Sequence, residues 1–101
     1  MVNKLKSITV KTLKYLISSK NIIIIDIRPL KLFKSFSIPN SININETELI
    51  NNPQKYITKT DECYIICSKG ISSKAVATIL YKKGYNTSSV IGGINAYKYY
   101  L

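Results

Sequence analysis

Two short runs of apolar residues constrain the fold of this chain more than any other feature of its sequence. Residues 22–25 are four isoleucines in a row, ended by Asp26 and soon afterwards by Pro29, and residues 63–67 form a second run. A strand that is hydrophobic at every position, rather than at alternate ones, is typical of a parallel sheet covered on both faces. We therefore expect a buried parallel strand at each run.

Helices are predicted before the first run and after the second. Thr9 is a suitable N-cap for a helix over residues 10–19, in which apolar residues recur at helical spacing. A longer helix is expected beyond the second run, capped by Ser72 or Ser73 and ended by Gly84. Its inward stripe is predicted to comprise Ala75, Val76, Ile79 and Leu80.

The remaining segments are shorter, and together with the helices they indicate the fold class. We expect an amphipathic piece at residues 30–36, a turn at 39–40, a brief strand at 41–44, a weak helix at 46–50, a strand at 90–91, a turn at 92–93 and a terminal helix at 94–100. Strands that alternate with helices at this spacing are typical of an α/β fold around a mostly parallel sheet. The length of 101 residues suits one hydrophobic core, so residues 1–101 are expected to form a single domain.

The absence of histidine excludes a large share of enzyme chemistry. A Cys-His pair, a Ser-His-Asp triad and a histidine-ligated metal are all impossible, and two cysteines cannot complete a tetrahedral zinc site. We expect neither a metal nor a cofactor. If the chain is an enzyme, its nucleophile is activated without an imidazole.

The cysteine content and the hydropathy pattern bear on the compartment. Residues 1–6 do not resemble a signal peptide, and the run of four isoleucines is far shorter than the ~20 residues that span a bilayer. Two cysteines in such a chain do not suggest a disulfide framework. The sequence therefore predicts a cytoplasmic, reduced protein without a membrane segment.

The charge of the chain is strongly positive: fifteen Lys and Arg residues face five Asp and Glu residues, for a formal net charge of +10. Such a composition attracts anions, which could be nucleic acid, an anionic membrane, an acidic partner protein or a small anionic substrate. A general bias of the composition towards Lys, Asn and Ile is an equally good explanation. Charge alone does not choose between them.

Cys67 is the residue that most suggests chemistry, because it ends a predicted strand and precedes a predicted helix. Ligands of open parallel sheets bind at this place, and unpaired N–H groups at a helix N-terminus favour a thiolate over a thiol. The residues that follow are small or flexible and would let their N–H groups turn towards the sulfur: Ser68, Gly70, Ser72 and Ser73. Lys69 and Lys74 would add positive charge at the rim. The alternative is an inert, buried cysteine.

Six segments, taken in order, resemble the rhodanese homology domain. They are Ile-Asp-Ile-Arg at residues 25–28, Phe33, Ser-Ile-Pro-Asn-Ser-Ile at 37–42, Cys-Ser-Lys-Gly-Ile-Ser-Ser at 67–73, Lys-Gly-Tyr at 83–85 and Ile-Gly-Gly-Ile-Asn-Ala-Tyr at 91–97. The resemblance is closest to the short, single-domain bacterial rhodaneses. It implies a three-layer α/β fold whose mostly parallel sheet has about five strands and helices on both faces.

The resemblance also implies a thiosulfate sulfurtransferase with a two-step reaction. The Cys67 thiolate attacks the outer sulfur of thiosulfate or of a persulfide donor. The resulting Cys67 persulfide then passes its sulfur to a thiol or protein acceptor. The N–H groups of the loop would stabilise the persulfide and bind the substrate. The residues so implied are Ser68, Lys69, Gly70, Ile71, Ser72 and Ser73.

Three residues depart from the family pattern. Ser37 stands where the family often has His, and Leu32 where it often has Glu; both are scaffold positions. Ser72 stands where many members have Arg, so Lys69 or Lys74 would have to supply the positive charge for an anionic donor.

Three alternative functions can be weighed against sulfur transfer. A phosphatase or arsenate reductase of the Cys-x5-Arg kind needs an arginine where this chain has Ser73, and its one arginine, Arg28, lies elsewhere. A catalytically idle rhodanese-like module for protein binding remains open. Nucleic-acid binding through lysines and the eight tyrosines is less favoured than a packing role, because Tyr97 matches an aromatic packing position of the family and a solvated lysine surface needs no partner.

The residues of interest outside the loop are a second cysteine and a charged pair. Cys63 shares a face of its strand with Cys67, but four extended residues separate the two by ~13 Å, so Cys63 is expected to be structural. Asp26 and Arg28 end the neighbouring strand and could support the loop through hydrogen bonds or an ion pair. A purely structural role for that pair is at least as good an explanation.

Overall fold

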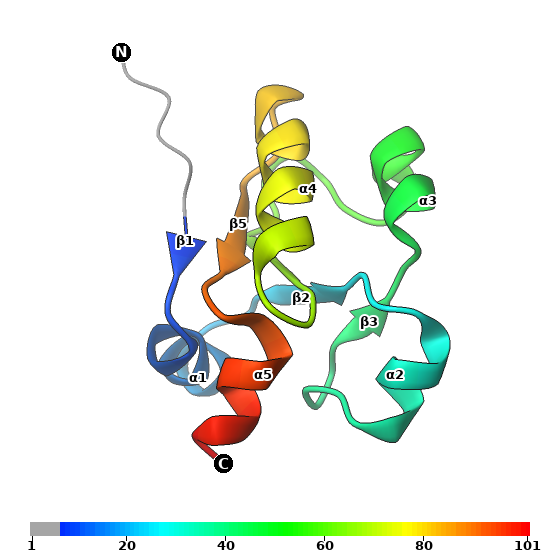
Figure 1. Ribbon diagram of the computed structural model, residues 1–101. Helices are drawn as coiled ribbons and strands as arrows, with labels where there is room; N and C mark the ends of the chain where they lie inside the picture. The colour runs from blue at the N-terminus through cyan, green and yellow to red at the C-terminus, as the bar shows by residue number, and fades with distance from the viewer. Residues whose placement is uncertain (1–6) are drawn as a thin grey trace.

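A five-stranded sheet forms the middle layer of the protein, as a computed structural model of residues 7–101 shows (Figure 1). The strands are β1 (Ser7–Ile8), β2 (Ile23–Asp26), β3 (Ile42–Asn43), β4 (Cys63–Ile66) and β5 (Thr87–Val90). Their order across the sheet is β1-β5-β4-β2-β3, and every pair is parallel. Both predicted parallel strands are therefore confirmed. Residues 1–6, which the predicted single domain includes, lie outside the described residues.

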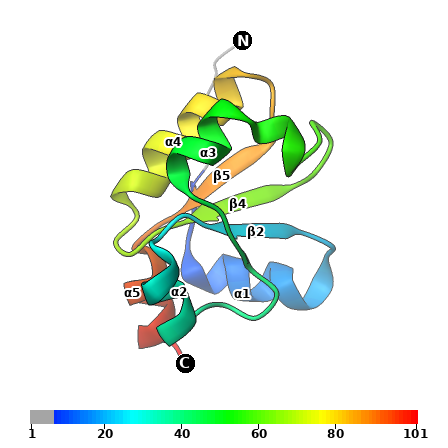
Figure 2. The same ribbon diagram turned by 90° about the vertical axis from the view of Figure 1, so that its right-hand side faces the viewer.

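Helices cover both faces of the sheet, which gives the three layers that are visible in Figure 2. The helices are α1 (Val10–Ser19), α2 (Leu30–Ser35), α3 (Glu46–Asn51), α4 (Ile71–Lys82) and α5 (Gly93–Tyr99), with a short 3₁₀ helix η1 (Pro53–Lys55). Helices α3 and α4 pack on one face, and α1 and α5 on the other. The expected α/β architecture is confirmed.

The two faces of the sheet explain why the strand runs are apolar throughout. In β2 and β4 successive side chains point to opposite faces: Ile25 and Ile65 enter the core beneath α3 and α4, whereas Ile24, Tyr64 and Ile66 enter the core beneath α1 and α5. Since helices cover both faces, the residues of these central strands are buried apart from the partly buried Ile23, and the alternation typical of a one-sided sheet is absent.

The start of α4 differs from the prediction that Ser72 or Ser73 caps it. The helix begins at Ile71, and the preceding Gly70 adopts a left-handed conformation with φ of 93° and gives no side-chain cap. Ser73 instead lies fully buried in the first turn. A polar residue can occupy that place because both its N–H and its hydroxyl contact the Cys67 sulfur.

The inward stripe of α4 is also shifted from the predicted one. Val76 and Leu80 are buried as expected, but Ala75 and Ile79 are exposed. Ser73 and Ala77 take their places on the inner face. The prediction followed hydrophobicity alone and therefore missed a buried serine whose polar atoms are satisfied. The predicted end of the helix is confirmed, since Gly84 follows Lys83 with φ of 99°.

The last strand begins earlier than predicted and is largely polar. β5 spans Thr87–Val90, whereas Ile91 is exposed in the following turn. The hydroxyl of Thr87 donates to the carbonyl of Ala77 at 2.8 Å, and Ser89 pairs with Ser7 of β1 at 3.0 Å. Hydroxyl groups with partners can be buried in a sheet, and so a hydropathy pattern misses both β5 and the two-residue β1 beside it.

The aromatic residues near the end of the chain divide into packed and exposed ones. Tyr97 is buried, and its ring centroid lies 6.2 Å from that of Phe36. Tyr99 and Tyr100 are exposed. The buried ring of Tyr97 is therefore not free to stack on a nucleic-acid base.

Candidate active site

Cys67 follows β4 directly, at the edge of the sheet where the carboxyl ends of the parallel strands lie. β4 has β5 on one side and β2 on the other, so the cysteine stands near the centre of that edge. The helix α4 begins four residues later, on the same side. This is the position at which parallel α/β sheets bind ligands, because the carboxyl ends of strands and the N-termini of helices leave backbone groups unpaired there.

The loop after Cys67 wraps backbone N–H groups around the sulfur. The N–H of Gly70 donates to Cys67 Sγ at 3.1 Å, and the N–H of Ser73 donates to it at 3.2 Å. The thiol in turn donates to the Ser73 hydroxyl oxygen at 3.2 Å. Two N–H donors aimed at one sulfur stabilise negative charge on it, and the serine hydroxyl can reverse its role and donate when the sulfur is ionised.

The first turn of α5 holds the loop in this orientation from the other side. The N–H of Ile94 donates to the carbonyl of Cys67 at 2.8 Å, and the N–H of Asn95 donates to the carbonyl of Ser68 at 3.0 Å. The carbonyls are therefore directed away from the sulfur. Gly93 makes the close approach possible, because a Cβ on it would lie 2.2 Å from the Cys67 carbonyl oxygen.

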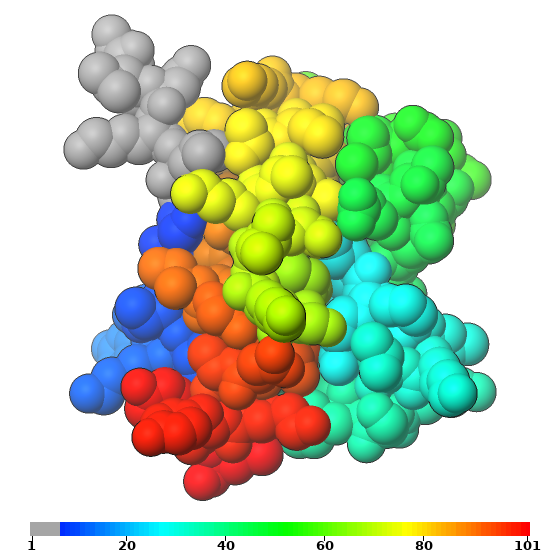
Figure 3. Space-filling view, viewed as in Figure 1, coloured from blue at the N-terminus to red at the C-terminus, as the bar shows by residue number. Residues whose placement is uncertain are grey.

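A cleft of about 390 Å³ opens over the sulfur. It is lined by Ile27, Arg28, Pro29, Glu46, Cys67, Ser68, Lys69, Ile71 and Ser72. In the space-filling view, the beginning of α4 lies between the segment that leads into α2 and the orange-red surface of α5 (Figure 3). The volume is within the range of small-molecule sites in proteins.

The structure places the predicted loop residues in two groups. Gly70 and Ser73 contact the sulfur from the side of the helix, whereas the other four residues line the cleft: Ser68, Lys69, Ile71 and Ser72. Lys74 is exposed and is not among the residues that line this cleft. Of the two lysines predicted to flank the cup, Lys69 is thus the one that lines the cleft.

Glu46 is a residue of the cleft that the sequence analysis did not single out. It is the first residue of α3, and α3 follows β3 at the same edge of the sheet. The signal that could have identified it is topological: segments that follow parallel strands gather at one edge. Helix patterning gave no reason to select it.

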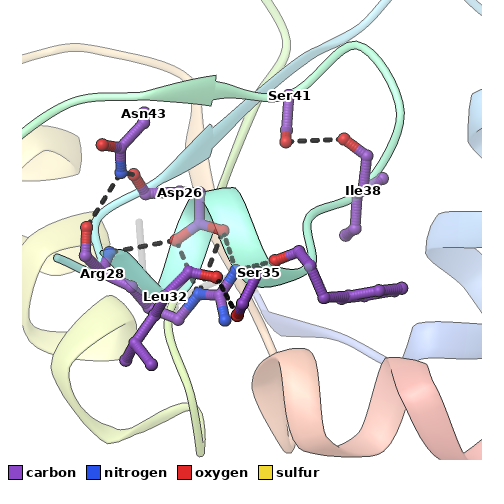
Figure 4. A network of polar contacts seen from close by, with 8 residues as sticks. Asp26, Arg28, Leu32, Ser35, Ile38, Ser41 and Asn43 are labelled. Atoms are coloured by element: carbon purple, nitrogen blue, oxygen red, sulfur yellow. Dashed lines mark hydrogen bonds and ion pairs between the residues drawn. The ribbon is translucent and has the colours of Figure 1, made fainter. Parts of the chain in front are cut away.

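Asp26 and Arg28 form a buried ion pair that shapes one wall of the cleft (Figure 4). The Arg28 guanidinium donates to both carboxylate oxygens of Asp26, with Nη2 to Oδ2 at 2.8 Å, and Nη2 also donates to the Phe36 carbonyl at 2.6 Å. The Asn43 amide donates to the main-chain carbonyls of both residues. Together, the Arg28 contact to Phe36 and the Asn43 amide tie the end of β2 to α2 and β3.

The ion pair does not extend to the cysteine loop. Within residues 7–101, no hydrogen bond joins the side chain of Asp26 or Arg28 to residues 67–73. Arg28 is 8% exposed, and the charge of its guanidinium is compensated by the fully buried carboxylate of Asp26. Any support that the pair gives to the loop is therefore through the shape of the cleft wall.

Cys63 is buried at the start of β4, in the same core cluster as Cys67. Burial raises the pKa of the Cys63 thiol to about 12. Since a raised pKa favours the protonated form, this thiol is neutral at physiological pH and ionises only in strong alkali. A neutral, enclosed thiol is a poor nucleophile.

Cys67 lines the open cleft, whereas Cys63 does not, and we therefore predict selective labelling. Iodoacetamide at pH near 8 is expected to add one carbamidomethyl group to the native protein, at Cys67, because Cys63 is protonated and enclosed. Intact mass spectrometry measures the adduct. Cys63→Ala should keep it and Cys67→Ser should lose it; two adducts on the native protein would contradict the prediction.

Residues 7–101 contain no group of three or more His, Cys, Asp or Glu side chains placed to hold a metal ion. In the same part of the chain, no helix has the length and hydropathy to cross a bilayer.

Comparisons with known proteins agree with one another. The family model of the rhodanese-like domain matches residues 9–99. Adenylyltransferase and sulfurtransferase UBA4 of Candida albicans is 33% identical over 86 residues, which are 77% of this chain and 20% of that protein. Thiosulfate sulfurtransferase GlpE of Coxiella burnetii is 30% identical over 87 residues, 82% of this chain and 78% of that protein.

A solved structure shows the same architecture. A rhodanese-related protein of Thermoplasma volcanium superposes with a TM-score of 0.84 at 29% identity, covering 94% of this chain and 92% of that one. The chain spans about a fifth of the length of UBA4 and most of the length of GlpE.

Proposed function

The chain belongs to the family of rhodanese-like domains, and from this premise we propose that it is a sulfurtransferase in which Cys67 carries a sulfane sulfur as a persulfide. The observation that carries the proposal is the pair of N–H donors, from Gly70 and Ser73, aimed at Cys67 Sγ beside an open cleft. Thiosulfate or a persulfide is the donor, and a thiol or a protein sulfur atom is the acceptor.

The first step loads the cysteine. The Cys67 thiolate attacks the outer sulfur of thiosulfate, a new S–S bond forms, and the old S–S bond breaks with its electron pair leaving on sulfite. The persulfide that remains carries the negative charge on its terminal sulfur. In the unloaded protein the N–H groups of Gly70 and Ser73 point to Cys67 Sγ, so they stabilise the thiolate that makes the attack and lie one S–S bond away from the charge of the persulfide.

The second step discharges the cysteine. An acceptor nucleophile attacks the terminal sulfur of the persulfide, and the Cys67 thiolate is restored as the leaving group. A thiolate surrounded by N–H donors is a stabilised leaving group, so the same contacts assist both steps. Histidine has no part in either step, and the chain contains none.

The surroundings of Cys67 argue against phosphate chemistry. Phosphatases with a similar cup use an arginine six residues after the cysteine, and here that residue is Ser73, which is buried against the sulfur. Arg28, the one arginine of the chain, is engaged by Asp26. Bidentate guanidinium recognition of a phosphoryl group is therefore missing at the loop.

Intact mass spectrometry tests the proposal directly. After incubation with thiosulfate, the protein is expected to gain the mass of one sulfur atom and to lose it again on treatment with dithiothreitol. Several donors are run in parallel, including an organic hydropersulfide. No adduct with any donor would overturn the enzymatic proposal in favour of a binding module.

Lys69 is expected to attract the anionic donor. It is exposed at the cleft, so its attraction for a dianion acts across solvent and is modest. We predict that Lys69→Ala lowers the rate of loading from the dianion thiosulfate about three- to tenfold and lowers loading from an alkyl hydropersulfide, which carries at most one negative charge, by clearly less. Loading rates by mass spectrometry measure both.

The matched control is Lys74→Ala, which removes the same charge from an exposed residue outside the cleft lining. It should affect neither donor. Equal losses for the two donors in Lys69→Ala would show that Lys69 does not bind the anion.

A further inference from the structure

Glu46 introduces a negative charge into a site that is otherwise expected to receive anions. The residue is exposed and lines the cleft together with Cys67 and Lys69. It also lines a neighbouring hollow of about 470 Å³, which shares the wall at residues 27–29 and continues to Leu30 and Asn43. Glu46 therefore stands where the two hollows meet.

The Glu46 carboxylate is not neutralised by the protein. Among residues 7–101, no hydrogen bond or ion pair engages it, whereas Glu48 on the same helix contacts Asn52, Tyr56 and Lys55. Both residues lie in the first turn of α3, where the helix dipole stabilises a carboxylate. Glu48 already supplies a negative charge to the N-terminus of α3 and has hydrogen-bond partners of its own. The dipole therefore does not explain why a second, unpaired carboxylate lines the cleft.

The charges around the sulfur are thus of both signs: Lys69 on the cysteine loop and Glu46 on α3. A small dianion is attracted by the first and repelled by the second. A thiol that is also an amino acid carries an ammonium group and a carboxylate in one small molecule. It can therefore pair with both Glu46 and Lys69. The combined hollows also exceed what a small inorganic oxyanion fills.

We propose that Glu46 determines the specificity of the site for a zwitterionic acceptor thiol, whose ammonium group it receives while Lys69 receives the carboxylate. This inference rests on the proposed sulfur transfer through Cys67. In the step concerned, the acceptor thiol loses its proton to solvent and its sulfur attacks the terminal sulfur of the Cys67 persulfide. One S–S bond forms and one breaks, the electron pair returns to Cys67, and the acceptor leaves as a persulfide.

The test compares two acceptors that differ by the ammonium group alone, cysteine and β-mercaptopropionate. Protein loaded with one sulfur is mixed with each thiol, and loss of the extra mass is followed in time. Because the two thiols differ in intrinsic reactivity, the measured quantity is the ratio of their discharge rates. Glu46→Gln is expected to lower the cysteine-to-mercaptopropionate ratio about three- to tenfold, and to speed loading from thiosulfate about threefold.

Glu48→Gln is the matched control, since it removes the same charge from the same turn of α3 but not from the cleft. It should leave both quantities as in the native protein. An unchanged ratio in Glu46→Gln, or an equal change in Glu48→Gln, would overturn the inference. Failure of the proposed function is recognised separately, because the native protein would then never gain the sulfur; that result would overturn this inference as well.

Discussion

Replacing Cys67 by serine is expected to abolish sulfur loading, with a fall in rate on the order of 10³-fold or more. A serine hydroxyl is a weak nucleophile unless a base removes its proton, and the chain has no histidine to act as one. The two N–H donors of the loop stabilise an anion but cannot abstract a proton. The gain of one sulfur by mass and the release of sulfite from thiosulfate measure the loss.

The control for Cys67→Ser is Cys63→Ala, which removes the other cysteine of the chain. Loading should persist in that variant, because Cys63 is buried with its pKa raised to about 12 and takes no part in the proposed reaction. Thermal unfolding of both variants checks that each is folded. Sulfur uptake by Cys67→Ser would place the reactive thiol at Cys63 and would refute the assignment.

Replacing Gly93 by alanine is expected to damage both stability and loading. Gly93 has φ of 61°, and a Cβ there would lie 2.2 Å from the Cys67 carbonyl oxygen and 2.7 Å from that of Ser68. Both oxygens are backbone atoms that accept hydrogen bonds from α5, so they cannot move without loss of those bonds. We expect the free energy of unfolding to fall by about 2–4 kcal/mol and the loading rate to fall at least about tenfold.

Gly84→Ala separates this crowding from the cost of the left-handed backbone alone. Gly84 has φ of 99°, and the nearest atom to its Cβ would be the Nζ of Lys59, the end of a flexible side chain, at 3.1 Å. That variant should lose only about 1 kcal/mol and should load sulfur normally. Urea denaturation measures stability in both; an equal loss in the two, with loading intact, would show that the contact with Cys67 is unimportant.

The elements that follow local patterns could be predicted from the sequence. The runs at residues 22–25 and 63–67 are apolar at every position because both faces of the sheet are covered, and the helix at residues 10–19 has a regular stripe and a capping threonine. Thr9 accepts the expected hydrogen bond from the Thr12 N–H. In these segments the periodicity and the tertiary packing agree.

The elements that depend on distant partners could not be predicted in the same way. β5 is buried although three of its four residues are polar, because Thr87 and Ser89 find partners on α4 and β1. The prediction that Ser73 caps α4 is wrong for the same reason, since its contact with the sulfur is not visible in the hydropathy of α4. A polar side chain is buried when a partner is within reach, and only the assembled structure supplies the partner.

For Cys67 itself, the sequence determined that the cysteine ends a buried strand just before a helix, and that no histidine can activate it. Only the tertiary structure decided what surrounds the sulfur: α5, which holds the loop carbonyls away, and Glu46, which brings a negative charge to the cleft. These groups lie more than twenty residues from Cys67 along the chain. Parallel strands bring them together, because every crossover returns the chain to the same edge of the sheet.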